Sequence, residues 1–412
     1  MNNYKSALFF LLLAHISFAQ SNSLTGSPYS LFGLGVESNS NTGINSGMGR
    51  TGVALESLET INLYNPASFA WLQSDRVVLD FGMYTEIQNV SSDDSDEVRF
   101  ASNFSNVALA SSLGSKSVAA ISLIPSTNVG YALIGVETNI EGSSEQFSSN
   151  IVGSGGLNEL RLDYAYKVLK NLSVGVKSSY LFGSIEENES IITDQSLLAI
   201  SEENYYNAFR WGLGLQYKIF KDYNLGFVAN FPTTLKGKRD TFIQKSTSST
   251  FTILEETTDE TIDDFELPLE LGFGISKRFK QLLLTADYSF KSWSSTDQSD
   301  TLGDYVDQNI FSFGAEYTVD SESYKYWKRV NFRAGLNYNS GYLEIDDTRI
   351  SSFDASFGIG LPISKRGRSL LNISYTLGNR GTTDSFLVEE NYNTLNINLT
   401  LTDIWFQKKK YN

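Results

Sequence analysis

The stretch LNINLTLT, residues 395–402, decides the fold class. Leucine and isoleucine occupy every second position, and asparagine and threonine fill the positions between them. A period of two places each set on one face of an extended strand, so the segment is predicted to be a β-strand with one apolar face and one polar face. The segments LRLDYAYKV (160–168) and VNFRAGLNYN (330–339) repeat the pattern.

This alternation runs from Ser74 almost to the end of the 412-residue chain and predicts about fourteen strands. Their expected spans are 75–89, 98–113, 116–140, 157–169, 172–187, 205–220, 223–238, 263–279, 281–294, 308–319, 328–345, 351–364, 368–380 and 392–406. Many exceed the roughly 5–6 residues usual in soluble sheets, and a tilted transmembrane strand needs about 9–11.

A soluble all-β protein is the alternative, in which one face of every strand would pack against another sheet. Here nearly every run keeps the same split over its full length, with Tyr, Phe and Trp near the ends of the runs. That pattern is typical of a lipid-facing exterior with aromatic girdles and a polar interior. The chain is therefore predicted to be all-β, a transmembrane antiparallel β-barrel of about 14 strands.

The connections alternate in length and in charge. Short turns such as KNL and RFKQ are basic, whereas the long connections, including 187–204 and 239–262, are acidic. Short turns on one side and long loops on the other are characteristic of outer-membrane barrels. We expect the basic side, with both termini, to be periplasmic and the acidic loops to be extracellular. The protein is therefore expected to be located in the cell outer membrane.

The N-terminus resembles a targeting segment. Lys5 precedes the apolar run ALFFLLLAHISFA, and small residues at positions 17 and 19 predict cleavage before Gln20, so residues 1–19 are expected to be a signal peptide. Residues 21–60 are rich in Ser, Asn and Gly and have no sustained period. No later run reaches the about 18 apolar residues of a transmembrane helix.

The composition disfavours catalysis. The chain has no Cys, and its one His is His15, within the predicted signal peptide. This removes the Ser–His and Cys–His nucleophile pairs and the usual zinc ligands, so we expect no enzyme, no metal and no cofactor. A net charge of −15 argues against nucleic-acid partners. The acidic stretches DDSDE (93–97) and DETIDD (259–264) lack EF-hand spacing and are read as solvated loops.

Charged residues on the polar faces are expected to point into the lumen. The candidates are Asp80, Arg161, Asp163, Glu270, Asp287 and Arg333. Lys167, Lys177, Arg210 and Glu316 share that expected placement. Carboxylate-only catalysis is one interpretation of such a set, but mixed charges inside a barrel more often form ion-pair networks. We favour the structural interpretation.

Three local motifs interrupt the alternation. GMGRTG (47–52) matches a dinucleotide-binding pattern, but no strand precedes it, so we read it as a loop that bends tightly inside a crowded lumen. Asn65, Pro66 and Ala67 form a rigid step just before the first strand. Pro125, followed by Ser126, Thr127 and Asn128, breaks the third run. Because proline cannot donate to the sheet, either a gap between neighbouring strands or a bulge near the rim is expected there.

These stretches resemble the FadL/TodX family of outer-membrane transport proteins. The similarity rests on ALESLETINLYNPASFAWL, with its Asn65-Pro66-Ala67 step, on SLIPSTNVGYAL with the kink, and on the later hairpins LPLELGFGISKRF and VNFRAGLNY. The resemblance implies a fourteen-stranded barrel (74–407), an N-terminal plug or hatch (20–73) inside it and a basic periplasmic tail (408–412). The ending DIWFQKKKYN resembles a signal for the outer-membrane assembly machinery.

The resemblance also implies a function. We expect an outer-membrane channel for passive uptake of hydrophobic or amphipathic small molecules, long-chain fatty-acid-like, with lateral exit at the kinked third strand. Outer-membrane lipid and a hydrophobic ligand are the expected partners. The alternative is a non-transport accessory or scaffold barrel in an outer-membrane protein complex, like the PorV-like partners of secretion systems. The long acidic connections offer no apolar substrate groove, which favours that alternative.

Overall fold

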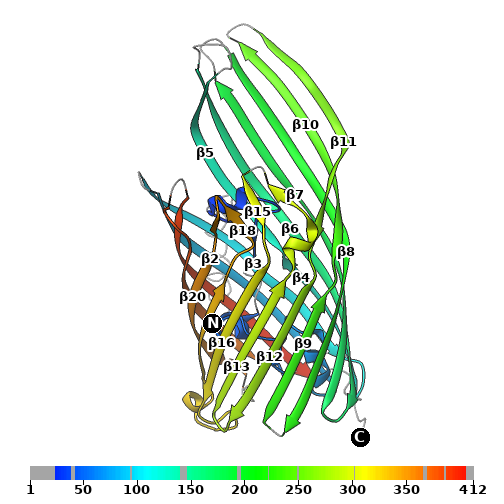
Figure 1. The fold of residues 1–412 in the computed structure, drawn as a ribbon. Helices are drawn as coiled ribbons and strands as arrows, with labels where there is room; N and C mark the ends of the chain where they lie inside the picture. Colours follow the sequence, from blue (N-terminus) through cyan, green and yellow to red (C-terminus); the bar gives the residue numbers. More distant parts are fainter. Residues whose placement is uncertain are drawn as a thin grey trace, which may run out of the picture.

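The computed structural model describes residues 24–38, 42–92, 95–139, 146–192, 196–220, 222–247, 250–300, 302–364, 369–384 and 387–404. These residues form a closed antiparallel barrel of fourteen strands, as the alternation predicts. Figure 1 shows the tilted strands surrounding short N-terminal helical segments drawn in blue. No helix among the described ranges is long and apolar enough to cross a membrane.

The fourteen strands of the wall follow one another in chain order. Three pairs of shorter segments, β4 with β5, β9 with β10 and β11 with β12, each make one strand. The fourteen strands are β2 (Arg76–Ser91), β3 (Asp96–Ser112), β4 (Ser117–Pro125) with β5 (Thr127–Asn139), β6 (Gln146–Leu169), β7 (Leu172–Ile192), β8 (Ser196–Phe220), β9 (Tyr223–Asn230) with β10 (Thr233–Thr247), β11 (Phe251–Leu267) with β12 (Glu270–Phe279), β13 (Leu282–Lys291), β16 (Gln308–Thr318), β17 (Asn331–Asn339), β20 (Ser352–Pro362), β21 (Leu370–Gly381) and β22 (Glu389–Ile404). The barrel closes where β2 pairs with β22 from Arg76↔Ile404 to Ser91↔Glu389.

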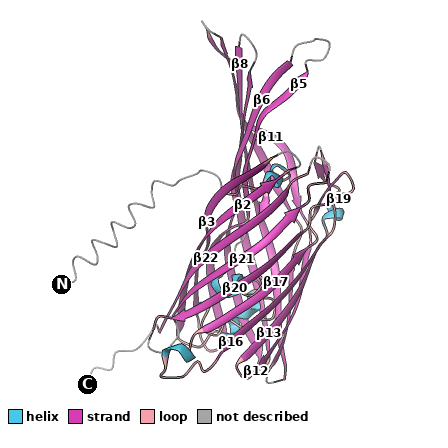
Figure 2. Cartoon of the chain, turned by 90° about the vertical axis from the view of Figure 1, so that its left-hand side faces the viewer, coloured by secondary structure: helices cyan, strands magenta, loops and turns pink. Residues whose placement is uncertain are grey.

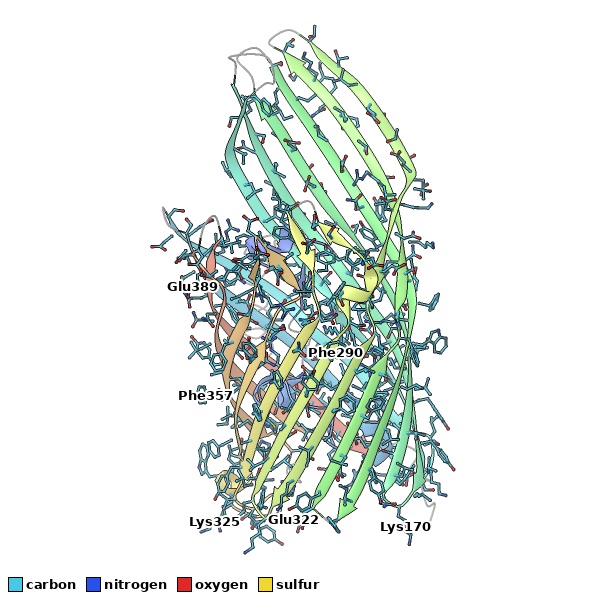
Figure 3. The ribbon with its side chains drawn as sticks, viewed as in Figure 1. Lys170, Phe290, Glu322, Lys325, Phe357 and Glu389 are labelled. Atoms are coloured by element: carbon cyan, nitrogen blue, oxygen red, sulfur yellow. The ribbon has the colours of Figure 1, made fainter. Side chains whose placement is uncertain are left out.

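The two faces of the wall have the chemistry that the alternation predicts. In β22, Leu395 and Ile397 are exposed on the outside, whereas Asn396 and Asn398 are buried on the inside. Figure 3 shows the same for Phe357, which points away from the wall. An apolar exterior and a polar interior are the reverse of a soluble fold and suit a barrel in lipid. The membrane solvates the outside, so the polar inside must be satisfied by protein.

The third strand breaks at Pro125 and leaves a lateral gap. Below the break, β4 pairs with β3 up to Val107↔Leu123 and with β6. Above it, β5 pairs with β6 on one side, and its other edge pairs with β1 (Val36–Glu37) of the N-terminal segment, not with β3. Of the two expectations for Pro125, the structure has the gap between neighbours rather than a bulge near the rim.

The N-terminal segment occupies the barrel interior. It contains η2 (Pro28–Leu31), β1, α2 (Gly43–Ser46) and η3 (Pro66–Trp71). We call residues 24–75 the plug, without the undescribed positions 39–41. Its side chains contribute much of the buried apolar core, including Met48, Ile61 and Phe69, each at most 1% exposed. Because the barrel interior is otherwise polar, these side chains pack mainly within the plug and against small wall residues such as Ala108 and Ala165.

Two predicted loops are wrong. The acidic connections expected over 187–204 and 239–262 are mostly strand, because β7 continues to Ile192, β8 begins at Ser196, β10 continues to Thr247 and β11 begins at Phe251. Likewise β6 begins at Gln146 rather than near residue 157. Antiparallel pairing with a long neighbour satisfies the backbone of these acidic segments, so charge alone did not make them loops.

These extensions rise above the rest of the barrel as an open sheet. We call it the upper sheet: β5, the first part of β6, the end of β7, the start of β8, the end of β10 and most of β11. Figures 1 and 2 show these strands projecting well beyond the other strand ends. Next to it, a small second sheet of β14 (Ser299–Asp300), β15 (Gly303–Tyr305), β18 (Leu343–Ile345) and β19 (Thr348–Arg349) lies at the barrel mouth.

Two short helical turns complete the described elements, η4 (Trp293–Thr296) near the mouth and η5 (Tyr326–Lys328) between β16 and β17. In Figure 3 the labelled Lys170, Glu322 and Lys325 lie at the end opposite the upper sheet. Several predictions concern residues outside the described ranges: the signal peptide 1–19, the acidic residues 93–94, the aromatic pair 405–406 and the tail 408–412.

Candidate functional site

A cavity of about 340 Å³ lies inside the barrel between the plug and the wall. It brings together residues that are far apart in sequence, including Pro125 and Thr127 at the kink and Tyr64 from the plug. Its charged lining residues are Glu37, Arg50, Glu159, Arg161, Lys177, Arg210, Glu270, Asp287 and Lys291. Apolar side chains such as Trp293 lie between them. An apolar guest in this cavity would therefore face charged groups and displace the water that solvates them, which is costly.

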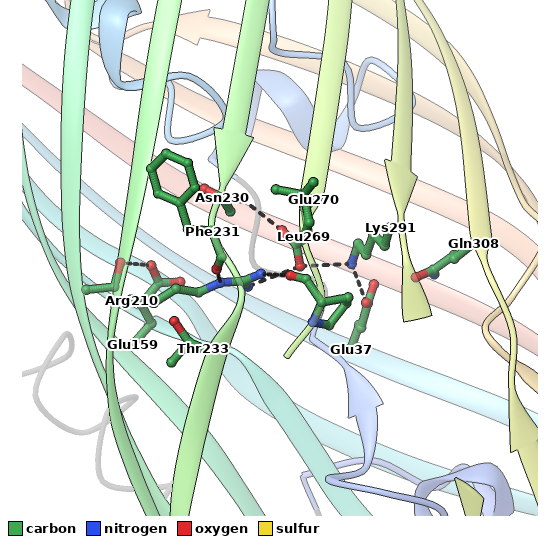
Figure 4. Close-up of polar contacts among 12 residues, drawn as sticks. Glu37, Glu159, Arg210, Asn230, Phe231, Thr233, Leu269, Glu270, Lys291 and Gln308 are labelled. Atoms are coloured by element: carbon green, nitrogen blue, oxygen red, sulfur yellow. Dashed lines mark hydrogen bonds and ion pairs between the residues drawn. The ribbon is translucent and has the colours of Figure 1, made fainter. Parts of the chain in front are cut away.

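A belt of ion pairs crosses one side of the cavity (Figure 4). Arg210 of β8 pairs with Glu270 of β12 at 3.1 Å and also donates to the carbonyl of Pro268 at 2.6 Å. Lys291 of β13 lies 3.8 Å from Glu270 and also pairs with Glu37 of the plug. The belt therefore links three wall strands, β8, β12 and β13, to β1. Glu270, predicted from sequence as a lumen residue, is its centre.

Two more predicted lumen residues hold the plug directly. The Asp287 Oδ2 atom accepts hydrogen bonds from the backbone N–H groups of Gly52 and Val53, at 2.6 and 2.9 Å. Arg161 donates to the carbonyl of Leu63 at 2.5 Å. Charge-assisted hydrogen bonds of this kind are roughly twice as strong as neutral ones. Both residues therefore clamp plug backbone to wall.

Of the remaining predicted lumen residues, Asp163 pairs within its own strand β6, whereas Arg333 and Asp80 link neighbouring wall strands. Asp163 forms a two-point pair with Arg161, at 2.6 and 2.7 Å, and fixes that guanidinium toward the plug. Arg333 pairs with Glu316 at 2.8 Å across β16 and β17. Asp80 accepts from three side chains on the neighbouring strands β3 and β22, namely Asn106, Asn398 and Thr400, each at 2.6 Å. None of the predicted residues Asp163, Arg333 and Asp80 lines the cavity.

The Asn65-Pro66-Ala67 step is where the plug meets the wall. The Asn65 side chain accepts from the Ala67 N–H at 3.0 Å and so caps η3, while Pro66 stands at its start, where a missing N–H costs nothing. The Asn65 amide also donates to the wall carbonyls of Leu215 and Phe227, both at 3.2 Å. One side chain thus starts the helical turn and fastens it to two strands.

At the end of η3, Trp71 is enclosed by polar partners. Its indole N–H donates to Gln216 at 2.9 Å, and the Lys218 ammonium lies 3.8 Å above the ring. Lys218 also pairs with Glu56 of the plug at 2.7 Å. This cation–π contact and ion pair tie the C-terminal end of the plug to β8.

The GMGRTG loop packs against the wall more closely than any side chain would allow. Gly49 has φ +62°, and a Cβ there would lie 2.6 Å from the backbone of Leu336. A Cβ on the facing Gly335 of β17 would lie 2.0 Å from the Gly49 nitrogen. Backbone touches backbone, which only two glycines permit. The motif is therefore a plug–wall contact, in line with the tight bend expected of it.

The plug also fills the lateral gap. The Ser38 N–H donates to the Ser126 carbonyl at 3.0 Å, and Asn128 of β5 pairs with Val36 of β1. On the other side of the gap, Arg99 of β3 donates to the Gly26 carbonyl at 3.0 Å. The predicted kink residues Ser126, Thr127 and Asn128 therefore contact the N-terminal segment, and the plug bridges strands that do not pair with each other.

Sequence reasoning missed several charged members of the cavity. Glu159 lies two residues before Arg161, and Lys291 lies four after Asp287, so the period of two within their strands was sufficient to place both inside. Glu37 and Arg50 carried no such signal, because the plug has no regular period. Tyr29 of the plug was also missed. Burial raises its pKa to about 12, so it stays protonated and donates to the Val388 carbonyl at 2.6 Å.

Within the described ranges, no group of three or more His, Asp or Glu side chains is placed to hold a metal ion. The arrangement instead consists of paired charges that hold polypeptide to polypeptide.

The architecture defines a class, the outer-membrane β-barrels with the fold of hydrocarbon channels. A Pseudomonas aeruginosa FadL homologue matches with a TM-score of 0.61 at 13% identity over 90% of this chain and 99% of its own. The Ralstonia pickettii toluene transporter TbuX matches at 0.57 and 17%, over 88% and 98%. CymD, a monoaromatic hydrocarbon channel, matches at 0.58 and 17%, over 88% and 97%. At such low identity these similarities establish the fold alone.

The family follows from the sequence. A family model described as BamG matches residues 1–412, so the chain belongs to the BamG family. No curated protein matches the sequence significantly. The FadL/TodX resemblance predicted from the sequence is thus confirmed at the level of the fold, with this chain on a divergent branch.

Proposed function

We propose that this chain is a non-transport accessory barrel of an outer-membrane protein complex, with its basic turns in the periplasm and its acidic upper sheet outside the cell. The observation that carries the proposal is the charge-lined lumen. The cavity has charged groups on several sides, and the predicted lumen residues Arg161, Glu270 and Asp287 bind the plug, directly or through Lys291. A hydrophobic solute would have no continuous apolar surface to follow.

The machinery that assembles outer-membrane barrels is the first candidate complex. Membership of the BamG family supports this choice over a secretion system. In this role the barrel supplies a rigid membrane anchor, and the plug keeps that anchor closed. The absence of His and Cys after His15 supports a role without catalysis.

Passive uptake of hydrophobic or amphipathic molecules is the second candidate. The fold shared with a toluene transporter and a hydrocarbon channel favours it, and so does the gap between β3 and β5, which would be the lateral exit. In this role the plug segment 24–38 must leave the gap. That movement would break the hydrogen bond between Arg99 and Gly26 and the pairing of β1 with β5.

Two measurements on one preparation separate these candidates. The full-length chain, tagged at its C-terminus, is purified from native outer membranes in mild detergent and also reconstituted into liposomes. The proposal predicts a stoichiometric protein partner and no flux of toluene or oleate above that of empty liposomes. A lone barrel that conducts either compound would establish the channel instead.

A further inference from the structure

The upper sheet has an inner face that continues the lumen wall upward. In β6, the residues 151, 153, 155 and 157 alternate on the same side as Arg161 and Asp163, which face the lumen. Residues directly paired across an antiparallel ladder share a face. The register therefore identifies the inner face of all six strands of the upper sheet.

One row of this face crosses the whole sheet. Leu133 pairs with Ile151, Ile151 with Glu189, Glu189 with Ile200, Ile200 with Ile243, and Ile243 with Glu255. The next row toward the tip adds the pair Ile191 and Leu198. The centre of the inner face is therefore an apolar band of six aliphatic side chains, here called the inner band: Leu133, Ile151, Ile191, Leu198, Ile200 and Ile243.

Carboxylates lie around the inner band, and one of them, Glu189, lies within its row between Ile151 and Ile200. The inner-face acids are Glu187, Glu189, Glu202, Glu255 and Glu260, and the inner-face bases are Arg239 and Lys245. Arg239 already pairs with Glu202 at 3.0 Å. The rim of the band is therefore acidic overall, in a chain whose net charge is −15.

No described helix or sheet forms a second layer over the inner band. At its base, η2 packs against β5 and η4 against β11, but no described helix or sheet packs over the rows that contain Ile151, Ile191 and Ile200. All three side chains are half-buried. Antiparallel sheets are ordinarily covered on one face, and this face carries half-buried aliphatic side chains that no described element covers. A single-layered sheet of this length is thus incomplete by itself.

We propose that the inner band binds an extracellular protein domain whose contact surface is apolar at the centre and carries Lys and Arg at its edge. Charge selects this occupant. A second copy of this chain would present the same acidic rim, and a lipid surface with anionic headgroups would also be repelled. A basic-rimmed protein satisfies both the aliphatic band and the carboxylates. This inference rests on the proposed function and names where its partner is held.

The free edge of β11 is a poorer docking site than this face. Three register irregularities along β10–β11 each place one extra residue on β11, between positions 253 and 265. Near the base, the Gln298 side chain pairs with the backbone of Glu266, donating to its carbonyl and accepting from its N–H, each at 2.8 Å. Bulges and caps of this kind protect an edge against strand addition. The partner therefore docks on the face and not by extending the sheet.

Opposite faces of the same strands provide the test. Ile151→Ser/Ile243→Ser removes two members of the inner band, and Val152→Ser/Phe242→Ser makes the matched change one residue along, on the outer face. Each full-length variant is purified from native outer membranes, and heat-modifiable migration on gels confirms that the barrel is folded. We expect at least tenfold less of the wild type's stoichiometric partner with the inner-face variant and an unchanged yield with the outer-face variant.

Cysteine crosslinking then identifies what touches the band, because the chain has no cysteine of its own. A Cys-reactive photocrosslinker at Ile200→Cys is expected to form a 1:1 protein adduct whose crosslinked peptide is rich in Lys and Arg. The same reagent at Phe242→Cys is expected to give none. An adduct of twice the chain's mass, an adduct with lipopolysaccharide, or equal partner yields from both double variants would overturn the inference while leaving the accessory function intact. A wild-type preparation without any partner would instead remove the proposed function itself.

Discussion

The barrel body and the upper sheet are built from the same strands but use their inner faces differently. In the body, the inward charges are paired with the plug or with each other, as Asp287 is with Gly52 and Arg333 is with Glu316. In the upper sheet, the inward face carries aliphatic side chains that no described element covers. One face is complete and the other is not, which is why we assign a closed anchor to the body and partner binding to the sheet.

Disrupting the contact between glycines should affect the body most. In Gly335→Leu, the new Cβ would meet the backbone of Gly49 at 2.0 Å, so the plug cannot seat and its docking loses at least about 3 kcal/mol. Limited proteolysis should then cleave within the plug. Gly114→Leu is the control, because nothing lies within 4 Å of its added Cβ. Equal protease resistance of the two variants would contradict a tightly seated plug.

Breaking one ion pair in each region compares the two directly. Arg161 and Asp163 are a buried pair, with side chains 4% and 0% exposed, so Arg161→Met leaves a buried carboxylate and should lower the free energy of unfolding by about 3–5 kcal/mol. Lys238 and Asp259 of the upper sheet are 54% and 77% exposed, and Lys238→Met should change it by less than about 1 kcal/mol. Urea titration of the folded barrel in micelles measures both. Similar losses of unfolding free energy in the two variants would contradict the difference between the barrel body and the upper sheet.

Neutralising single carboxylates gives a smaller version of the same contrast. Asp287→Asn keeps one acceptor but removes the charge that holds the Gly52 and Val53 amides, so we expect a loss of about 1–2 kcal/mol. Asp259→Asn retains a residue that tolerates the φ of +58° found there and should stay within about 0.5 kcal/mol of the wild type. The same urea titration applies, and a larger effect at Asp259 would reverse the contrast.

Much of the body was predictable from sequence, and the upper sheet was not. The period of two specified the strand number and placed Asp80, Arg161 and Asp287 inside, since burial follows from alternation once lipid covers the outside. It could not show that Asp287 binds plug amides, because the plug has no period. The acidic segments around Glu187 and Glu255 read as loops in the sequence because their charge density outweighs the weaker alternation there. Register across six strands, which is long-range information, was needed to assemble the inner band.

The smallest effect on the barrel should come from shortening the upper sheet. Deleting residues 241–258 leaves Asp240 and Asp259 as a two-residue connection between Arg239 and Glu260, which are already paired. The contacts that hold the barrel body together, between its wall strands and with the plug, do not involve residues 241–258. We therefore expect its unfolding free energy to change by less than about 1 kcal/mol. The amount of copurified partner should nevertheless fall sharply. Loss of the folded barrel in this variant would show that sheet and body are one stability unit.

The most direct test of the central claim measures flux with the α2 part of the plug fixed to the wall and with it released. The Oγ atoms of Ser46 in the plug and Ser374 in β21 lie 2.8 Å apart, so Ser46→Cys/Ser374→Cys places two thiols within disulfide reach in a chain with no other cysteine. Toluene and oleate flux into liposomes, and partner copurification from membranes, are measured with the bond formed and reduced. A static, closed anchor predicts no flux and full partner retention in both states. Flux of toluene or oleate in either state would contradict it.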